Sequence, residues 1–122
     1  TINGSPAHRH PNGGGWVADS ATVSLRAWIS PGAVIGDGAV IGDGAVIGDG
    51  AVIGDGAWIG IGAVINPGAW IGTDAVINLG AWIGTDAVIG HGAWIDRNTV
   101  IAPGARIGPD ARDEAEKKET ER

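Results

Sequence analysis

Few side chains in this chain of 122 residues could do chemistry. Cysteine is absent, which excludes disulfides, thiolate nucleophiles and zinc sites of the cysteine type. His8 and His10 stand two residues apart, so an extended backbone would turn both toward one metal ion. A metal ion needs more ligands than these two. We therefore interpret both as loop histidines and predict no metal site.

The remaining candidates lie farther along the chain. His91 could act as a general base, but no serine or second titrating group accompanies it in the repeat described below. Asp19, Asp37 and Asp55 are separated by 18 residues and could offer oxygen ligands to Ca²⁺. Aspartate is equally typical of tight turns, which is the interpretation we prefer. We predict no catalytic residue and no cofactor.

Composition narrows the range of partners. The formal net charge is -6 at pH 7, which argues against binding to nucleic acid or to an anionic membrane. Residues 56–73 are uncharged but contain Asn66, Pro67 and five glycines, so we expect no membrane helix there. No charged segment followed by an apolar one opens the chain, so we expect no signal peptide. We expect a soluble protein of unknown location with no small-molecule substrate.

A six-residue repeat organises most of the chain. Isoleucine recurs at every sixth position from Ile29 to Ile107, in a register that Val17 and Val23 begin. Alanine stands two residues before these positions from Ala21 to Ala111, with Thr99 as the single exception, and Val or Trp lies between them in most repeats. The hexads number sixteen from residue 17 to residue 112, without an insertion.

This period predicts short strands joined by corners. Six residues make about 1.7 turns of an α-helix, so the repeat cannot keep one face of a helix apolar. Within each hexad Ala and Ile point to one side of a strand, and Val or Trp points to the other. Gly-Asp-Gly and Asn-Pro-Gly segments supply the turns. Three hexads would close one coil of 18 residues around a core of Ile and Ala.

Residues separated by 18 positions would share a column along such a stack. The predicted first corner holds Asp19, Asp37, Asp55, Thr73, His91 and Pro109; the second holds Leu25, Asp43, Ile61, Leu79 and Arg97; the third holds Pro31, Asp49, Pro67, Thr85 and Pro103. The flat faces present Val and Trp to solvent, and the interface candidates are Trp58, Trp70, Trp82 and Trp94. Large exposed apolar patches mark interaction surfaces, although strand propensity alone would also favour these residue types. We predict a homo-oligomer that forms through these faces.

The pattern resembles the hexapeptide-repeat superfamily, whose signature is aliphatic, small, two variable residues, small, variable. The resemblance covers residues 17 to about 111 and implies an all-β, single-domain left-handed parallel β-helix of about five coils with short terminal caps. The left hand comes from the resemblance alone, because parallel crossovers are generally right-handed. The superfamily includes acyltransferases that use coenzyme A and γ-class carbonic anhydrases with zinc held between subunits.

Residues 63–69, 76–81 and 101–105 look like the sugar-nucleotide acetyltransferase branch of that superfamily. The position that matches its general-base histidine is Thr85 here. We therefore predict that the protein is not an enzyme. Four nearly identical hexads between Gly36 and Ile59 indicate an idealised, engineered or consensus member, with a recently expanded natural repeat as the alternative.

The ends depart from the repeat. We predict an irregular cap over residues 1–16, in which Trp16 and Ile2 cover the first coil, and the β-helix over residues 17–112. Residues 113–122 are predicted to form a polar tail or a short helix that Asp110 could cap. The expected function is a structural, engineered solenoid scaffold without catalytic activity. The alternative is a trimeric acyltransferase-like enzyme that depends on acetyl-CoA.

Overall fold

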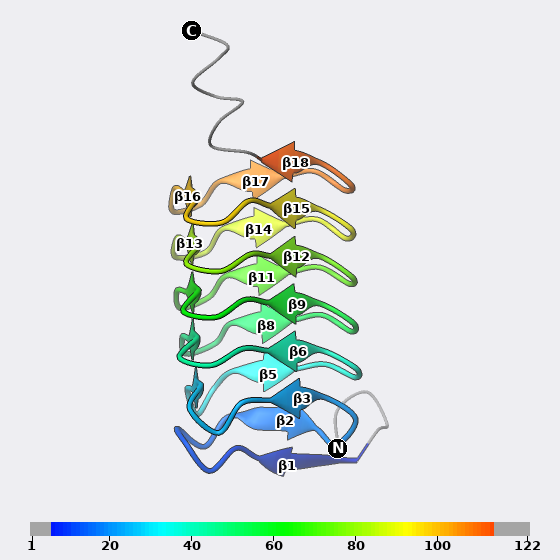
Figure 1. The fold of residues 1–122 in the computed structure, drawn as a ribbon, viewed down its shortest axis with the longest axis vertical. Coiled ribbons are helices and arrows are strands. Elements are labelled where there is room, and N and C mark those ends of the chain that lie inside the picture. The colour runs from blue at the N-terminus through cyan, green and yellow to red at the C-terminus, as the bar shows by residue number, and fades with distance from the viewer. Residues whose placement is uncertain (1–5, 114–122) are drawn as a thin grey trace, which may run out of the picture.

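The hexads fold into a left-handed parallel β-helix whose coils stack along one axis (Figure 1). Three sheets give the stack a triangular cross-section. The computed structural model describes residues 6–113. Each hexad contributes one two-residue strand and one corner, and three hexads complete a coil. The predicted fold class is confirmed.

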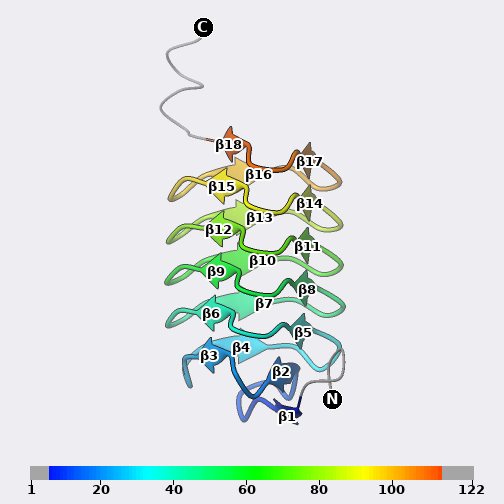
Figure 2. The same ribbon diagram turned by 90° about the vertical axis from the view of Figure 1, so that its right-hand side faces the viewer.

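Three sheets form the sides of the stack, and Figure 2 shows them from a second direction. The seven-stranded sheet contains β1 (Ala7–Arg9), β2 (Trp16–Ala18), β5 (Val34–Ile35), β8 (Val52–Ile53), β11 (Trp70–Ile71), β14 (Val88–Ile89) and β17 (Arg106–Ile107). The six-stranded sheet contains β3 (Thr22–Val23), β6 (Val40–Ile41), β9 (Trp58–Ile59), β12 (Val76–Ile77), β15 (Trp94–Ile95) and β18 (Arg112–Asp113). The five-stranded sheet contains β4 (Trp28–Ile29), β7 (Val46–Ile47), β10 (Val64–Ile65), β13 (Trp82–Ile83) and β16 (Val100–Ile101).

The strand register follows the 18-residue spacing that the sequence predicts. Trp70 lies opposite Val52 on one side and Val88 on the other, and all pairs except that of β1 with β2 are parallel. The hydrogen bonds between coils run in both directions, because successive residues of a parallel strand bond to opposite neighbours. The N–H of Trp28 donates to the carbonyl of Ala45 in the next coil, whereas the N–H of Ile29 donates toward the cap, to the carbonyl of Asn12.

The core is a narrow prism of isoleucine and alanine. The inward isoleucine of each hexad from Ile29 to Ile95 is at most 2% exposed, and the alanines from Ala27 to Ala93 are fully buried. The Val and Trp side chains between them point outward, as the two-residue alternation of a strand requires. Burial of each isoleucine contributes about 1.5–3 kcal/mol.

The N-terminal cap differs from the prediction in how it closes the stack. β1 pairs antiparallel with β2, while Asn12 and Gly15 exchange backbone hydrogen bonds with Ile29. The buried His10 side chain donates to the carbonyl of Ala27 at 3.0 Å, and the Asn12 amide donates to the same oxygen at 3.1 Å. These groups satisfy carbonyls that face the N-terminal end.

Trp16 does not cover the first coil, because it is the outward residue of β2. The Arg9 guanidinium lies 4.4 Å from the centre of its ring. Ile2 lies outside the described residues, as does the C-terminal segment for which a tail or short helix was predicted, beyond Asp113. Asp110 itself adopts a left-handed turn with φ of 59°, and the repeat continues into β18. No helix in residues 6–113 is long and apolar enough to cross a membrane.

Candidate functional site

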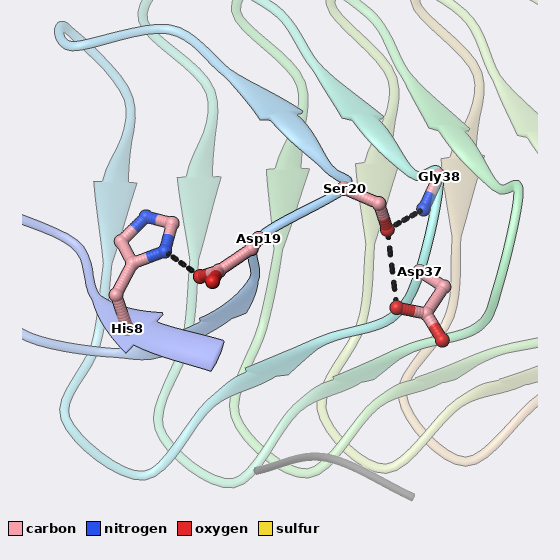
Figure 3. A network of polar contacts seen from close by, with 5 residues as sticks. All are labelled: His8, Asp19, Ser20, Asp37 and Gly38. Atoms are coloured by element: carbon pink, nitrogen blue, oxygen red, sulfur yellow. Dashed lines mark hydrogen bonds and ion pairs between the residues drawn. The ribbon is translucent and has the colours of Figure 1, made fainter. Parts of the chain in front are cut away.

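The first corner carries the polar network nearest the N-terminus (Figure 3). His8 Nδ1 lies 2.6 Å from Asp19 Oδ1, which joins the cap to the first coil. In the same turn as Asp19, the Ser20 hydroxyl reaches the next coil, where it donates to Asp37 at 3.1 Å and accepts from the N–H of Gly38 at 3.0 Å. The side chains of this corner therefore bind the turns of successive coils together.

The aspartates of this corner are engaged as turn residues. The N–H of Asp37 donates to the Asp55 carboxylate in the following coil at 2.9 Å. No three His, Cys, Asp or Glu side chains of residues 6–113 are placed to hold one metal ion. His8 and His10 have separate partners, Asp19 and the carbonyl of Ala27, so the structure does not bring the two together on a shared site.

A groove of about 490 Å³ surrounds His91, farther along the first corner. Its lining consists of Trp70, Gly72, Thr73, Asp74, Gly90, His91 and Pro109. His91 is exposed, and Thr73 occupies the same column one coil earlier. The groove thus places an imidazole, a hydroxyl and an indole ring together, which is a combination that could bind a polar ligand and exchange a proton with it.

Asp74 lines this groove without being directed at His91. Its backbone is left-handed, with φ of 61°, a conformation that Asp tolerates better than most residues. A Cβ added at Gly56 would lie 2.3 Å from Asp74 Oδ1, so the carboxylate leans toward the preceding coil. His91 belongs to the following coil. We predicted that no titrating group accompanies His91. That prediction overlooked Asp74, which belongs to the preceding coil and lines the same groove.

Thr85 lies apart from this groove. It occupies the exposed tip of the third corner, between β13 and β14, while His91 occupies the first. Thr85, where the resemblance places a general base, and His91 therefore lie at different corners of the stack.

The predicted interface residues lie on the flat faces. Trp58, Trp70 and Trp82 expose 46%, 49% and 38% of their surface, one on each sheet. Trp94 is less exposed than these three and is half-buried, because the Arg112 guanidinium lies 3.9 Å from the centre of its ring. The four candidates therefore do not form one patch but lie on three separate faces.

The second corner is the most apolar edge of the molecule. Leu25, Ile61 and Leu79 are 74%, 63% and 49% exposed at the tips of its turns. Beside them lies an apolar groove of about 390 Å³, centred on the coil of β6 and Asp43 and bordered by Trp58. The sequence analysis assigned these residues to one column without recognising a site, although Leu and Ile are unusual at turn tips.

Comparison with known proteins places this fold among transferases. The family model described as bacterial transferase hexapeptide (six repeats) matches residues 26–54, 50–85 and 80–109. No curated protein matches the chain.

Several solved structures resemble the chain at low identity. Serine acetyltransferase of Neisseria gonorrhoeae, solved with serine, is 24% identical, with a TM-score of 0.53, over 74% of this chain and 37% of that one. The acetyltransferase domain of PglB from the same species is 26% identical, with a TM-score of 0.44, over 85% and 49%. PerB of Caulobacter crescentus, solved with CoA and GDP-perosamine, is 24% identical, with a TM-score of 0.41, over 80% and 50%. The chain thus spans about half or less of the length of these proteins.

The expectation that the protein is not an enzyme is contradicted by these findings. The family model that matches residues 26–54, 50–85 and 80–109 describes transferases. The expectation rested on Thr85 at the position that matches the general base and on the lack of a titrating group in the column of His91. That reasoning missed the groove in which the first corner gathers His91, Thr73 and Trp70.

Proposed function

The chain belongs to the bacterial transferase hexapeptide family. We propose that it serves as a solenoid scaffold that self-associates through its flat Val/Trp faces. The observation that carries the proposal is the exposure of Trp58, Trp70 and Trp82 on rigid, flat sheets. Trp is favoured at the centres of protein interfaces, where it removes a large apolar area from water.

The faces have the size that an interface needs. Each strip of Val and Trp runs roughly 25 Å along the stack at about 4.8 Å per coil. Removal of apolar surface from water contributes about 25 cal/mol for each Å², and the entropy of association offsets much of this gain. The narrow Ile prism holds the faces rigid, so little conformational entropy is lost when two copies meet.

The regularity of the repeat supports an idealised, engineered or consensus origin for this scaffold. The hexads between Gly36 and Ile59 are nearly identical, and Tyr, Phe, Met and Cys are absent from the whole chain. Interior positions that are restricted to Ile and Ala are typical of a repeat chosen for uniform packing.

Substitution of the exposed tryptophans tests the scaffold proposal. Trp58→Thr, Trp70→Thr and Trp82→Thr should keep the fold, because these side chains point away from the core. At least one of them should lower the average mass that light scattering reports at a given concentration. A protein that is monomeric at high concentration would contradict self-association through the faces.

A second candidate function, acetyl-CoA-dependent acyl transfer by a trimeric enzyme, is favoured by the His91 groove. His91 would act there as the general base that removes a proton from the acceptor. Binding of acetyl-CoA to the native state alone should raise the melting temperature. Acetyl transfer that disappears in His91→Ala, with the fold retained, would support this candidate, whereas transfer unaffected by that change would exclude His91 as the base.

A further inference from the structure

The second corner has a chemical character that its role as a turn does not explain. Turn tips favour Asp, Asn, Gly, Ser and Pro, and the other two corners follow this rule almost throughout. Val and Trp on the faces have strand propensity as an alternative explanation. Leu25, Ile61 and Leu79 have no such explanation, yet they are 74%, 63% and 49% exposed.

Charge distinguishes this corner as well. Asp43 and Asp96 lie there together with Arg26 and Arg97, so its formal charges cancel. Within residues 6–113, the other two corners carry aspartates and no Lys or Arg. The second corner is therefore the one edge of the described solenoid where another acidic copy of this chain could approach without net repulsion.

The shape of the corner supplies both halves of a contact. Ile61 and Leu79 form adjacent projections, and the apolar groove lies on the coil of Asp43, between Leu25 and Ile61. Its walls include Val40, Ile41 and Trp58. The projecting Ile61 and Leu79 and the groove at Asp43 lie in one column along the stack. Neighbouring positions in this column are separated by the rise of one coil, about 4.8 Å.

From these observations we infer that a second copy of this chain docks antiparallel against the second corner, about a two-fold axis at Ile61. This inference rests on the proposed self-association and adds a contact separate from the flat faces. With Ile61 facing the partner's Ile61, reversal of the stack sets Leu79 opposite the partner's Asp43, beside its groove. The contact is reciprocal, as a two-fold interface requires.

The charges select the antiparallel orientation over a parallel one. In the antiparallel arrangement the coil of Leu25 and Arg26 faces the partner's coil of Asp96 and Arg97. Arg26 then lies across from the partner's Asp96, and Arg97 lies one coil from the partner's Asp43, within the reach of its long side chain. A parallel arrangement would set Asp43 against the partner's Asp43 and Arg97 against the partner's Arg97, which is unfavourable.

Introduced thiols test the orientation directly, because the natural chain contains no cysteine. Ile61→Cys should form a disulfide-linked dimer on mild oxidation, since facing residues on a two-fold axis meet the short Cβ separation that a disulfide needs. Asp43→Cys and Leu79→Cys should each remain unlinked alone and should form a mixed dimer when combined. Thr85→Cys, at the exposed tip of the third corner, is the matched control and should remain unlinked. Efficient linkage of Leu79→Cys with itself would overturn the antiparallel arrangement.

Charge and size changes test the energetics of the same contact. Ile61→Asp should raise the dissociation constant by about tenfold or more, as loss of a central interface residue does, while Thr85→Asp should leave it unchanged. Asp43→Arg should weaken association, and the added change Arg97→Asp should restore it. Circular dichroism should show the same β-structure in all variants.

The outcomes separate this inference from the proposed self-association. If Trp70→Thr weakens association while Ile61→Asp does not, and Ile61→Cys stays unlinked, the faces associate and the corner inference is wrong. A monomeric natural chain at all concentrations would contradict both. Loss of the dimer in Ile61→Asp, together with the mixed Asp43→Cys and Leu79→Cys dimer, would establish the antiparallel contact.

Discussion

Thr99 occupies the inward position at which the repeats from Ala21 to Ala111 otherwise have alanine. It is 3% exposed, and its hydroxyl has no hydrogen-bond partner among the described residues. A buried hydroxyl without a partner costs about 1–3 kcal/mol, because the group loses its hydrogen bonds to water. Threonine is thus larger than the alanine of the other repeats and differs from it in polarity.

Thr99→Val should therefore stabilise the protein by about 1 kcal/mol, since it removes the hydroxyl and keeps the volume of the side chain. The measurement is the free energy of unfolding in urea. Thr99→Ser is the control, because it keeps the hydroxyl and loses the methyl group, and it should destabilise the protein. Equal stability of Thr99→Val and the natural chain would indicate that the hydroxyl is satisfied in solution.

At the scale of the hexad, the first corner has glycine before the turn tip from Gly36 onward, whereas the other two corners also have Ser, Asn, Asp or Ala there. Gly72 precedes Thr73, and a Cβ added at Gly72 would lie 2.6 Å from the backbone nitrogen of His91 in the next coil. Backbone atoms cannot move aside as a flexible side chain could. The close stacking of the coils, rather than the conformation of the turn, therefore requires glycine here.

Gly72→Ala should destabilise the protein by roughly 1–3 kcal/mol, as overpacking in a tight core does. The matched control is Gly108→Ala. Gly108 holds the same place in the last described coil, and an added Cβ there would have no described atom within 4 Å. Thermal unfolding should show a clear loss for the first variant and little change for the second. Equal melting temperatures would show that the coils can separate at this corner without cost.

The repeat itself could be predicted from the sequence because its information is local. The spacing of Ile and Ala fixes which side of each strand is buried, and the strand pairs fall at the predicted separation of 18 residues. A cap was predicted, but its strand β1 and its contacts could not be, because they depend on interactions such as that of His10 with Ala27, which no periodicity encodes. The groove at His91 was missed for a related reason: it depends on how far Asp74 and Trp70 project from neighbouring turns.

At the scale of the whole molecule, the N-terminal edge of the stack presents both N–H and carbonyl groups, as a parallel sheet edge does. The N-terminal cap satisfies these groups: β1 pairs with β2, the carbonyl of Asn12 accepts from the N–H of Ile29, and His10, Asn12 and Gly15 donate to the carbonyls of Ala27 and Ile29. Unpaired strand edges are templates for pairing with other chains, so the cap limits growth along the axis.

Deletion of residues 1–15 should convert side-by-side association into end-to-end growth. The deletion exposes the carbonyls of Ala27 and Ile29 and the N–H of Ile29, and these match in spacing the N–H and carbonyl groups that a strand directs toward its C-terminal neighbour, as Trp28 does toward Ala45. Such a head-to-tail contact does not close on itself, so it propagates into filaments. Electron microscopy and light scattering should show filaments that lengthen with concentration. His10→Ala, which removes one donor but keeps β1, should lower the melting temperature without producing filaments. A truncated protein that folds and keeps one fixed size would show that the cap stabilises the first coil but does not control assembly.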